Sequence, residues 1–246
     1  MAAGKLLGLG DLPDGERGLA RKLEECRERV VAAAERGSHD PARVRVVVVT
    51  KYVDEEVIRA LAALGVRDFG ENRVQQLEAR ASVFQSIPDA CVHFIGHLQR
   101  NKAKRIFGVV DVFHALDSTR LLEELERRAV ASSDKLPAEI YVEVNVSDEV
   151  EKTGLAQSEL PGLLAACRAA PTIGPRVRGL MGMAALTDDT ERVRASFRRL
   201  RELRDRAVDE GLLAAGAELS MGMSDDFEIA VEEGATVVRV GSYFFS

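Results

Sequence analysis

Short apolar runs of the kind that form buried strands recur eight times along this chain, and amphipathic stretches separate most of them. The eight runs lie at residues 45–51, 67–71, 91–96, 110–116, 139–146, 178–184, 218–223 and 236–242. Several are rich in valine or isoleucine, which is typical of strands buried on both faces of a parallel sheet. Eight strands that alternate with helices predict a closed (β/α)8 barrel, whose usual size is roughly 250 residues.

The stretches between these runs have helical periodicity and suitable capping residues. We expect helices over residues 54–65, 118–130, 160–170 and 189–211. Asp54 and Ser118 suit helix starts, and Gly65 and Gly211 suit helix ends. An extra N-terminal helix is predicted over residues 17–36, because apolar residues recur there every three to four positions.

An open, doubly wound sheet is the alternative for a chain of alternating strands and helices. Such a sheet more often has five or six strands and a GxGxxG turn after the first strand, and that motif is absent here. The chain has 246 residues, of which 46% are hydrophobic, and no linker divides it. We therefore expect a flexible lead over residues 1–16 and a single barrel over residues 17–246.

Net charge and hydropathy indicate whether the chain binds nucleic acids or membranes. The formal net charge is −6, whereas a large nucleic-acid footprint normally needs a basic surface. The basic run at residues 99–105 is interpreted as the solvated face of a short helix. No apolar run approaches the roughly 18 to 20 residues that span a bilayer, and the amino terminus does not read as a secretory signal. We therefore expect neither a nucleic-acid nor a membrane partner.

Cysteine usage bears on the compartment. The three cysteines, Cys26, Cys91 and Cys167, lie far apart and show no metal-binding spacing. Unpaired cysteines of this kind favour a reducing, cytoplasmic setting. Because no second domain or large apolar surface patch is evident, we also expect a monomer.

The loops at the carboxyl ends of barrel strands collect binding and catalytic residues. Polar residues or glycines follow most of the predicted strands. They are Lys51, Gly70–Asn72, Gly96–His97, Asn145, Ser220–Ser224 and Gly241–Ser242, with Arg239 inside the last strand. Lys51 directly follows the run VVVVT, and an ammonium beside a core costs free energy unless it has a partner or a task. Most strand-end lysines nevertheless reach solvent and carry no chemistry.

Two further positions have both a structural and a functional interpretation. Arg239 cannot lose its charge and needs an acceptor, which is either Glu143 in an ion pair or an atom of a ligand. Barrels often bind phosphate near the last two strands, where Ser224 and Gly241–Ser242 lie. Alternatively, Ser224 is only the N-cap of the helix in SDDFEIAVEEG.

Together these residues point to one ligand. Strands 1 and 8 are neighbours in a closed barrel, which brings Lys51 close to Arg239. A phosphorylated aldehyde could bond to Lys51, place a ring nitrogen at Arg239 and lodge its phosphate near Ser224 and Gly241–Ser242. Pyridoxal 5′-phosphate (PLP) has these features.

The chain resembles the pyridoxal phosphate homeostasis proteins, which are PLP-binding proteins with an alanine-racemase-like barrel. The resemblance extends from about residue 17 to residue 242 and rests on seven segments in order. They are VVVVTKY, FGENRVQQL, HFIGHLQRNK, HALDS, EVNVSDEVEKTGL, RGLMGMAAL and LSMGMSDDFEIAVEEGATVVRVGS. Seven ordered segments make the match specific, whereas a single lysine motif would not.

The resemblance also implies roles for individual residues. Lys51 would bind PLP as a Schiff base, Arg239 would face the pyridine nitrogen, and Asn72 would lie near the ring. The residues that would hold the phosphate are Ser224, Gly241 and Ser242.

Other parts of the match are less informative. His97 and Asn101 lie within a shared segment without an assigned role. The chain ends in YFFS, where family members usually continue with a small apolar residue and a final glycine, so the packing of the last turn is the part in question.

The implied function is that of a PLP carrier, which buffers the free vitamin B6 pool and supplies apo-enzymes. Arginine at the ring nitrogen favours the neutral pyridine, a weak electron sink. Racemases of this barrel class add a tyrosine base from another domain and a partner subunit, and we expect no such domain in 246 residues. The alternative is a PLP-dependent racemase or related enzyme. A third class is an RNA- or protein-binding module that uses residues 99–105.

Overall fold

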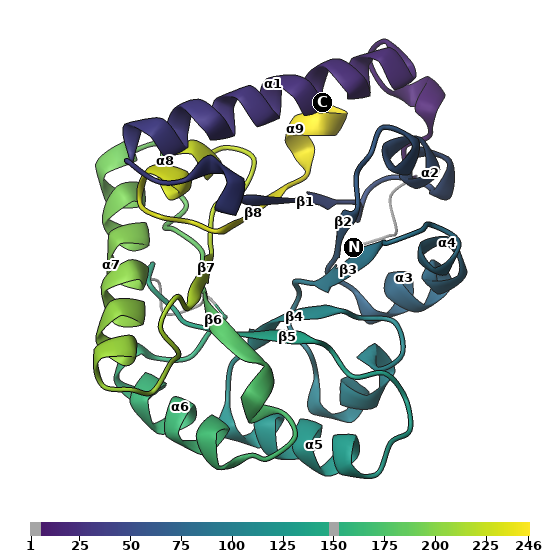
Figure 1. Ribbon diagram of the computed structural model, residues 1–246. Coiled ribbons are helices and arrows are strands. Elements are labelled where there is room, and N and C mark those ends of the chain that lie inside the picture. Colours follow the sequence, from purple (N-terminus) through teal and green to yellow (C-terminus); the bar gives the residue numbers. More distant parts are fainter. Residues whose placement is uncertain (1–5, 148–152) are drawn as a thin grey trace.

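In the computed structural model the chain closes into a barrel of eight parallel strands surrounded by helices (Figure 1). The structure describes residues 6–147 and 153–246. Each strand pairs with the next, and β1 pairs with β8 to close the barrel. The strands are β1 (Arg45–Val49), β2 (Asp68–Glu71), β3 (Cys91–Phe94), β4 (Val112–Leu116), β5 (Glu139–Glu143), β6 (Val177–Met181), β7 (Glu218–Ser220) and β8 (Val237–Val240). The predicted (β/α)8 barrel is therefore confirmed.

The helices lie outside the barrel and connect successive strands. The α-helices are α1 (Gly15–Arg36), α2 (Glu55–Ala63), α3 (Val74–Ala79), α4 (Ala81–Gln85), α5 (Thr119–Val130), α6 (Leu160–Ala169), α7 (Thr190–Asp209), α8 (Phe227–Glu232) and α9 (Ser242–Phe245). The 3-10 helices are η1 (Leu9–Asp11), η2 (Pro41–Arg43), η3 (Arg100–Ile106), η4 (Gln157–Glu159) and η5 (Gly174–Arg176). Within the described ranges, no helix combines the length and the apolar character needed to cross a membrane.

Helix capping follows the sequence pattern closely. The side chains of Asp54 and Ser118 each accept a hydrogen bond from the amide three residues further on, at 3.1 and 3.3 Å. Gly65 and Gly211 follow the ends of α2 and α7 with φ angles of 89° and 68°. Because L-residues with a side chain rarely adopt such angles, glycine is the residue that lets the chain leave each helix.

Several strands end before the apolar runs that predicted them. The run at residues 139–146 continues past β5, which ends at Glu143, and both Val144 and Val146 are buried beyond that point. Apolar residues stay buried under the surrounding helices after the strand pairing stops, so hydropathy does not mark the edge of the barrel. Helices α3 and α4 were not predicted, because each is short and their periodicity breaks at Arg80.

The amino-terminal region differs in detail from the expected boundary. Helix α1 begins at Gly15 rather than at residue 17. The backbone of Leu7 pairs with Tyr52 and Asp54, at 2.9 and 3.0 Å, in the loop after β1. Residues 1–5 of the predicted lead and residues 148–152 of the family-like segment lie outside the described residues, so the flexibility of the lead stays a prediction.

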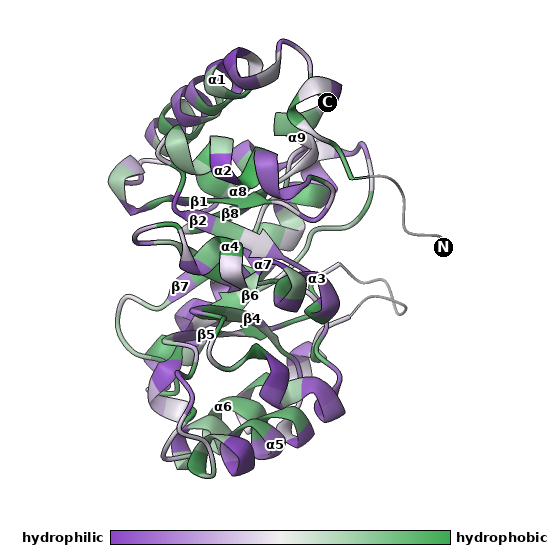
Figure 2. Ribbon diagram, turned by 90° about the vertical axis from the view of Figure 1, so that its right-hand side faces the viewer, coloured by the Kyte–Doolittle hydropathy of each residue, from purple (hydrophilic) through white to green (hydrophobic). Residues whose placement is uncertain are grey.

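The extra helix α1 packs outside the barrel against α8 and α9 (Figure 1). Its buried stripe contains Leu19, Leu23, Cys26 and Val30, as the periodicity predicted. The main core lies between the strands and the helix layer. In Figure 2 the outer helices carry hydrophobic and hydrophilic residues in alternation, as expected for helices with one face on this core. The barrel interior holds a smaller apolar cluster and several buried polar side chains.

A buried ion pair braces the turn that follows β1. Arg80, at the end of α3, is bonded to the carboxylate of Glu71, and both side chains are buried. The guanidinium also donates to the carbonyl oxygens of Thr50, at 3.0 Å, and of Val53. These two carbonyl groups flank Lys51 and Tyr52, so Arg80 fixes the backbone on both sides of the lysine.

Removing Arg80 should therefore destabilise the fold strongly. Arg80→Ala leaves the Glu71 carboxylate buried without its cation, and such a loss costs about 3–5 kcal/mol. Arg59→Ala is the matched control, because Arg59 pairs with Glu55 on the surface of α2 and such pairs contribute less than about 1 kcal/mol. Urea denaturation measures both free energies of unfolding, and equal small losses in the two variants would contradict this account.

Candidate functional site

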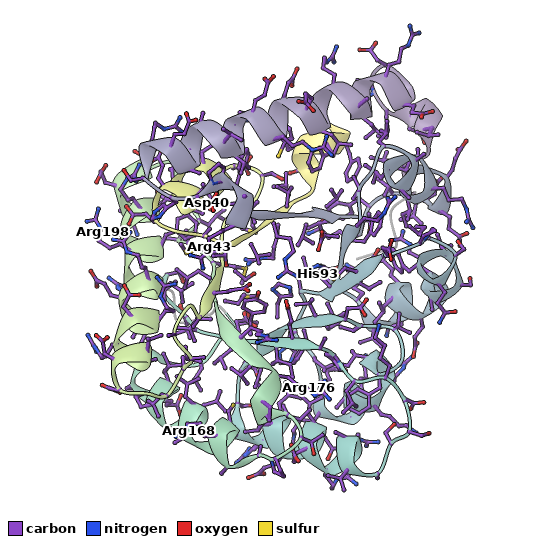
Figure 3. All side chains as sticks on the ribbon, viewed as in Figure 1. Asp40, Arg43, His93, Arg168, Arg176 and Arg198 are labelled. Carbon is purple, nitrogen blue, oxygen red and sulfur yellow. The ribbon has the colours of Figure 1, made fainter. Side chains whose placement is uncertain are left out.

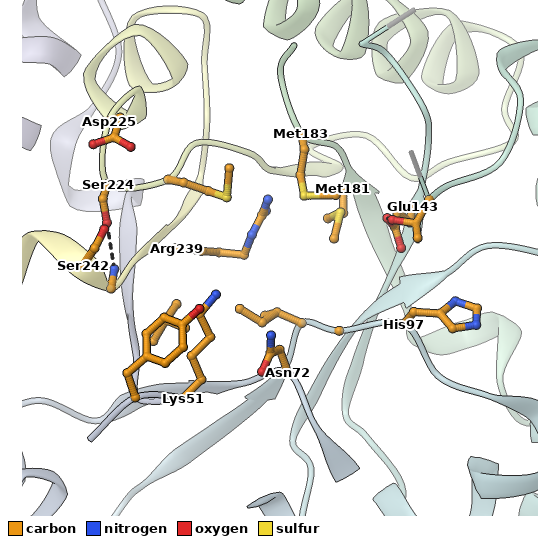
Figure 4. A pocket seen from close by; sticks show the side chains of 17 residues that line it. Lys51, Asn72, His97, Glu143, Met181, Met183, Ser224, Asp225, Arg239 and Ser242 are labelled. Carbon is orange, nitrogen blue, oxygen red and sulfur yellow. Dashed lines mark hydrogen bonds between the residues drawn. The ribbon is translucent and has the colours of Figure 1, made fainter. Parts of the chain in front are cut away.

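A cavity of about 510 Å³ opens at the carboxyl ends of the barrel strands. All six predicted site residues line it, although they come from four different strand ends. They are Lys51, Asn72, Ser224, Arg239, Gly241 and Ser242. Figure 4 shows that Lys51 and Arg239 reach into the same space, with Ser224 and Ser242 together at one end.

Lys51 lies two residues beyond β1. It is on a turn whose backbone carbonyl groups accept hydrogen bonds from other side chains. Its carbonyl oxygen accepts a hydrogen bond from the Gln76 side chain at 2.8 Å. Its ammonium group lies 4.8 Å from the ring centre of Tyr52, which is 57% exposed at the cavity mouth. The described residues offer the Lys51 ammonium no ion pair, so the amine is available to a ligand in the cavity.

Arg239 lies on β8, beside the strand that carries the lysine. The pairing of β1 with β8 sets Val47 opposite Arg239. The guanidinium is buried and donates from Nη1 to Ser220 Oγ at 2.7 Å and from Nη2 to the Gly182 carbonyl oxygen at 3.2 Å. Neither acceptor is charged, and the ion pair with Glu143, one of the two alternatives for Arg239, is not formed among the described residues.

Two carboxylate groups that make no hydrogen bond to Arg239 interact with its positive charge. Burial lowers the pKa of Arg239 to about 10, while the carboxylates of Glu143 and Asp226 act in the opposite direction. The guanidinium therefore stays cationic at neutral pH. A buried cation with only neutral direct partners is a strong attractor for an acceptor atom in the cavity.

Ser224 joins the loop after β7 to the start of α9. Its hydroxyl oxygen accepts hydrogen bonds from the amides of Gly241, at 3.1 Å, and Tyr243, at 3.3 Å. It does not cap α8, because that helix begins at Phe227 with Asp226 as its N-cap residue. The structure thus corrects the interpretation of Ser224 as a helix cap and gathers hydroxyl and amide groups at one corner of the cavity.

Two glycines shape this corner for different reasons. Gly222 has a φ of 94°, and a Cβ there would lie 2.5 Å from the Ala230 side chain, so the loop requires glycine. A Cβ on Gly241 would meet Val49 of β1 at 3.2 Å. Glycine at 241 therefore lets the end of β8 approach β1 closely.

The opposite wall of the cavity contains residues that sequence analysis did not assign. Glu143 lies at the end of β5, where its Oε1 accepts from Thr153 at 2.6 Å, and burial raises the pKa of this carboxyl group. Its Oε2, like Oδ1 of Asn72, is buried without a hydrogen-bond partner in the described part of the chain. The sequence suggests Glu143 only as a partner for Arg239, because a glutamate within a strand gives no signal of which way its side chain points.

The two residues without an assigned role are placed differently. His97 lines the cavity and is bonded through Nδ1 to Asp117 at 3.1 Å. Asn101 is exposed on η3 and does not line the cavity.

One group of possible metal ligands occurs in the described residues, at the other end of the barrel. The ligand atoms of Asp68, Cys91 and His93 lie within 4.8 Å of one another, near the amino ends of β2 and β3. His93 Nε2 is already bonded to Asp68 at 2.9 Å. A hydrogen bond therefore accounts for this contact without a metal ion.

The chain is similar to a known protein family over most of its length. The profile of the alanine racemase N-terminal domain matches residues 23–246. A pyridoxal phosphate homeostasis protein from Aquifex aeolicus is 38% identical over 224 residues, covering 91% of this chain and 96% of the relative. One from Pseudomonas aeruginosa is 36% identical over 228 residues, covering 92% of this chain and 94% of the relative.

A solved structure of a relative is also similar to this chain. The structure of PipY from Synechococcus elongatus with PLP bound superposes with a TM-score of 0.75 at 32% identity, covering 93% of this chain and 100% of that one. Fold and sequence are therefore both shared over nearly the whole chain. The chain belongs to the alanine racemase N-terminal domain family and, within it, to the pyridoxal phosphate homeostasis proteins.

Proposed function

We propose that this protein binds PLP in the cavity at the carboxyl ends of its strands and serves as a carrier of the cofactor. The observation that supports this most directly is that one cavity joins an accessible lysine amine, a buried arginine and a corner of hydroxyl and amide groups. These groups match the aldehyde, the ring nitrogen and the phosphate of PLP.

Lys51 is the residue that would hold the cofactor covalently. When bound, PLP supplies an aldehyde that reacts reversibly with amines. The neutral side-chain amine of Lys51 would bond to the aldehyde carbon, and the aldehyde oxygen would leave as water with the two hydrogens of that amine. Because the backbone around Lys51 is fixed by Arg80 and Gln76, the amine is presented to the cavity from a rigid turn.

Arg239 determines what kind of chemistry the site favours. A carboxylate beside the ring nitrogen would keep that nitrogen protonated, whereas a cationic donor favours the neutral pyridine. A neutral ring withdraws electrons weakly, so carbanions next to the bound amine are poorly stabilised. Arg239 therefore suits a protein that stores the aldehyde better than an enzyme that turns over amino acids.

The positions of the tyrosines support the same proposal. Tyr141 is buried in the barrel and donates to Glu218 at the amino end of β7, away from the cavity. Tyr243 contacts Glu25 of α1 at 3.4 Å. Tyr52 is next to Lys51 in sequence and at the rim. None of the three tyrosines of the chain is placed as a second base across the cavity from Lys51.

The finer aspects of the proposal concern partners and location. We propose that apo-enzymes receive the cofactor and that the protein acts as a cytoplasmic monomer. The described cysteines are free thiols, which suits a reducing compartment. A reactive aldehyde attacks amines at random, so holding it on one lysine protects other proteins until delivery.

Replacement of the lysine tests covalent binding. Lys51→Ala should abolish the imine absorbance band and the borohydride-stable mass increase seen with PLP, because no other residue replaces its amine. Lys104→Ala on η3 is a matched surface control and should behave as the wild type. Peptide mass spectrometry locates the modified residue, and a modified lysine other than Lys51 would refute the assignment.

Replacement of Ser224 tests the phosphate corner. Ser224→Ala removes a hydroxyl group that would contact a charged phosphate, and such hydrogen bonds contribute about 1.5–3 kcal/mol. We expect the affinity for PLP to fall roughly tenfold to hundredfold, while the affinity for pyridoxal, which lacks the phosphate, stays the same. Ser82→Ala on α4 is the control. An equal loss for both ligands would place the phosphate elsewhere.

The carrier function itself predicts transfer without turnover. Protein loaded with PLP should restore the activity of an apo-aminotransferase, and the cofactor absorbance should leave the carrier as activity appears. Incubation of the loaded protein with L-alanine or L-serine should give no more D-enantiomer than free PLP gives. Racemisation well above that level, measured by chiral chromatography, would favour the enzyme alternative.

A further inference from the structure

A continuous chain of hydrogen bonds runs through the barrel interior from the cavity toward the opposite end. Arg239 Nη1 contacts Ser220 Oγ at 2.7 Å, and Ser220 Oγ contacts His114 Nδ1 at 2.8 Å. His114 Nε2 lies 2.9 Å from His93 Nδ1, and His93 Nε2 lies 2.9 Å from Asp68 Oδ1. Five strands contribute one residue each, and Figure 3 shows His93 inside the barrel. We call these five residues the interior relay.

The relay is sealed from water over most of its length. Ser220, His93 and His114 are fully buried, and Arg239 is nearly so. The ring of His114 stacks on Tyr141 with ring centres 4.7 Å apart and an angle of 7° between the planes. Because buried polar atoms need hydrogen-bond partners, each member depends on its neighbours in the chain.

The direction of every hydrogen bond in the relay follows from Arg239. A guanidinium only donates, so Ser220 Oγ accepts from it. Because the described residues offer the Ser220 hydrogen no acceptor other than His114 Nδ1, Ser220 donates to that nitrogen. His114 must then donate from Nε2 to His93 Nδ1. His93 in turn donates from Nε2 to the Asp68 carboxylate, so both histidines are neutral and carry their hydrogen on Nε2.

We infer that Ser220, His114 and His93 are positioning residues that hold Arg239 in place and keep the interior beside it free of any second positive charge. This inference rests on the proposed function, in which Arg239 faces the ring nitrogen of PLP. With both histidines neutral, the relay adds no positive charge next to Arg239, and it links the orientation of Arg239 to Asp68 at the far end.

A proton added to the relay would break this arrangement. A doubly protonated His93 would donate from Nδ1 to His114, and His114 would then donate from Nδ1 to Ser220. Ser220 Oγ would receive two donors, and the described residues offer its own hydrogen no other acceptor. The structure therefore has a full set of hydrogen bonds in one protonation state only.

The electrostatic surroundings agree with two neutral imidazoles. Burial lowers the pKa of His93 and, more strongly, that of His114, and the hydrogen bond from His93 to Asp68 only partly offsets the effect at His93. The charged groups that act on the histidines from the other strands are Arg45 of β1, Glu139 of β5 and Arg239 of β8. Glu218 of β7 contacts Arg45 at 3.4 Å. Both arginines act against protonation.

Nitrogen NMR of the protein without cofactor tests the protonation state directly. The chain has only four histidines, so selective ¹⁵N-histidine labelling gives few signals, and single replacements assign them. We expect His93 and His114 to be Nε2–H tautomers at pH 7 and to remain neutral well below the ordinary histidine pKa of about 6.5. Exposed His39 and His97 serve as reference signals. An Nδ1–H tautomer or an imidazolium at either buried position at pH 7 would overturn the relay.

Replacement of Ser220 tests the effect on the cofactor site. Ser220→Ala removes the acceptor of Arg239 and the donor to His114. We expect roughly fivefold weaker PLP binding, the size of one lost hydrogen bond, and a shifted midpoint in the pH titration of the bound cofactor's absorbance. Ser220→Thr keeps the hydroxyl group and should restore the wild-type midpoint.

A second buried serine supplies the control. Ser196 on α7 also makes two hydrogen bonds, to Arg192 and Ala185, but does not contact Arg239. Ser196→Ala should leave the titration midpoint unchanged even if it lowers the melting temperature. Equal midpoints and affinities in the two alanine variants would refute a positioning role. If the wild type bound no PLP, the proposed function would fail, whereas the NMR experiment would still decide the relay.

Discussion

The pairing of β1 with β8 is the contact on which the rest of this site depends. Four pairs of residues, from Arg45 with Val237 to Val48 with Val240, join the first strand to the last strand. This closure places the lysine turn after the first strand beside the arginine of the last strand. It also brings Gly241 against Val49, so that the end of β8 and the start of α9 form one corner of the cavity. An open sheet of the same strands would leave these groups at opposite edges.

The buried charged side chains in and near the cavity have three different kinds of surroundings. Arg80 and Glu71 form a direct ion pair, and this pair uses its remaining donors to fix the lysine turn. Arg239 has only neutral direct partners, and it depends on Ser220 and Gly182. Glu143 keeps one oxygen without a partner in the described residues, and burial raises its pKa. Of these three groups, Arg239 and Glu143 line the cavity without a direct ionic partner among the described residues, which is why the cavity suits a polar ligand.

The elements that sequence predicted best are those with local causes. The caps at Asp54 and Ser118 and the glycines after α2 and α7 depend on contacts within a few residues, and they were predicted correctly. Predicted strand ends were less accurate, since burial continues past the barrel edge. Ser224 was open to two interpretations, because a serine before acidic residues also fits a helix start. Its partners, the amides of Gly241 and Tyr243, belong to a distant part of the chain.

The sequence by itself determined the eightfold alternation, the closed barrel and the set of residues at the strand ends, because hydropathy period and chain order decide which strands neighbour each other. Only the tertiary structure decided that Arg239 is held by Ser220 rather than by Glu143. The histidines on β3 and β4 had no sequence signal beyond their place in apolar strands. Strand residues alternate between the inside and the outside of a barrel, and the partner of an inward side chain is set by stagger between strands, which no local pattern encodes.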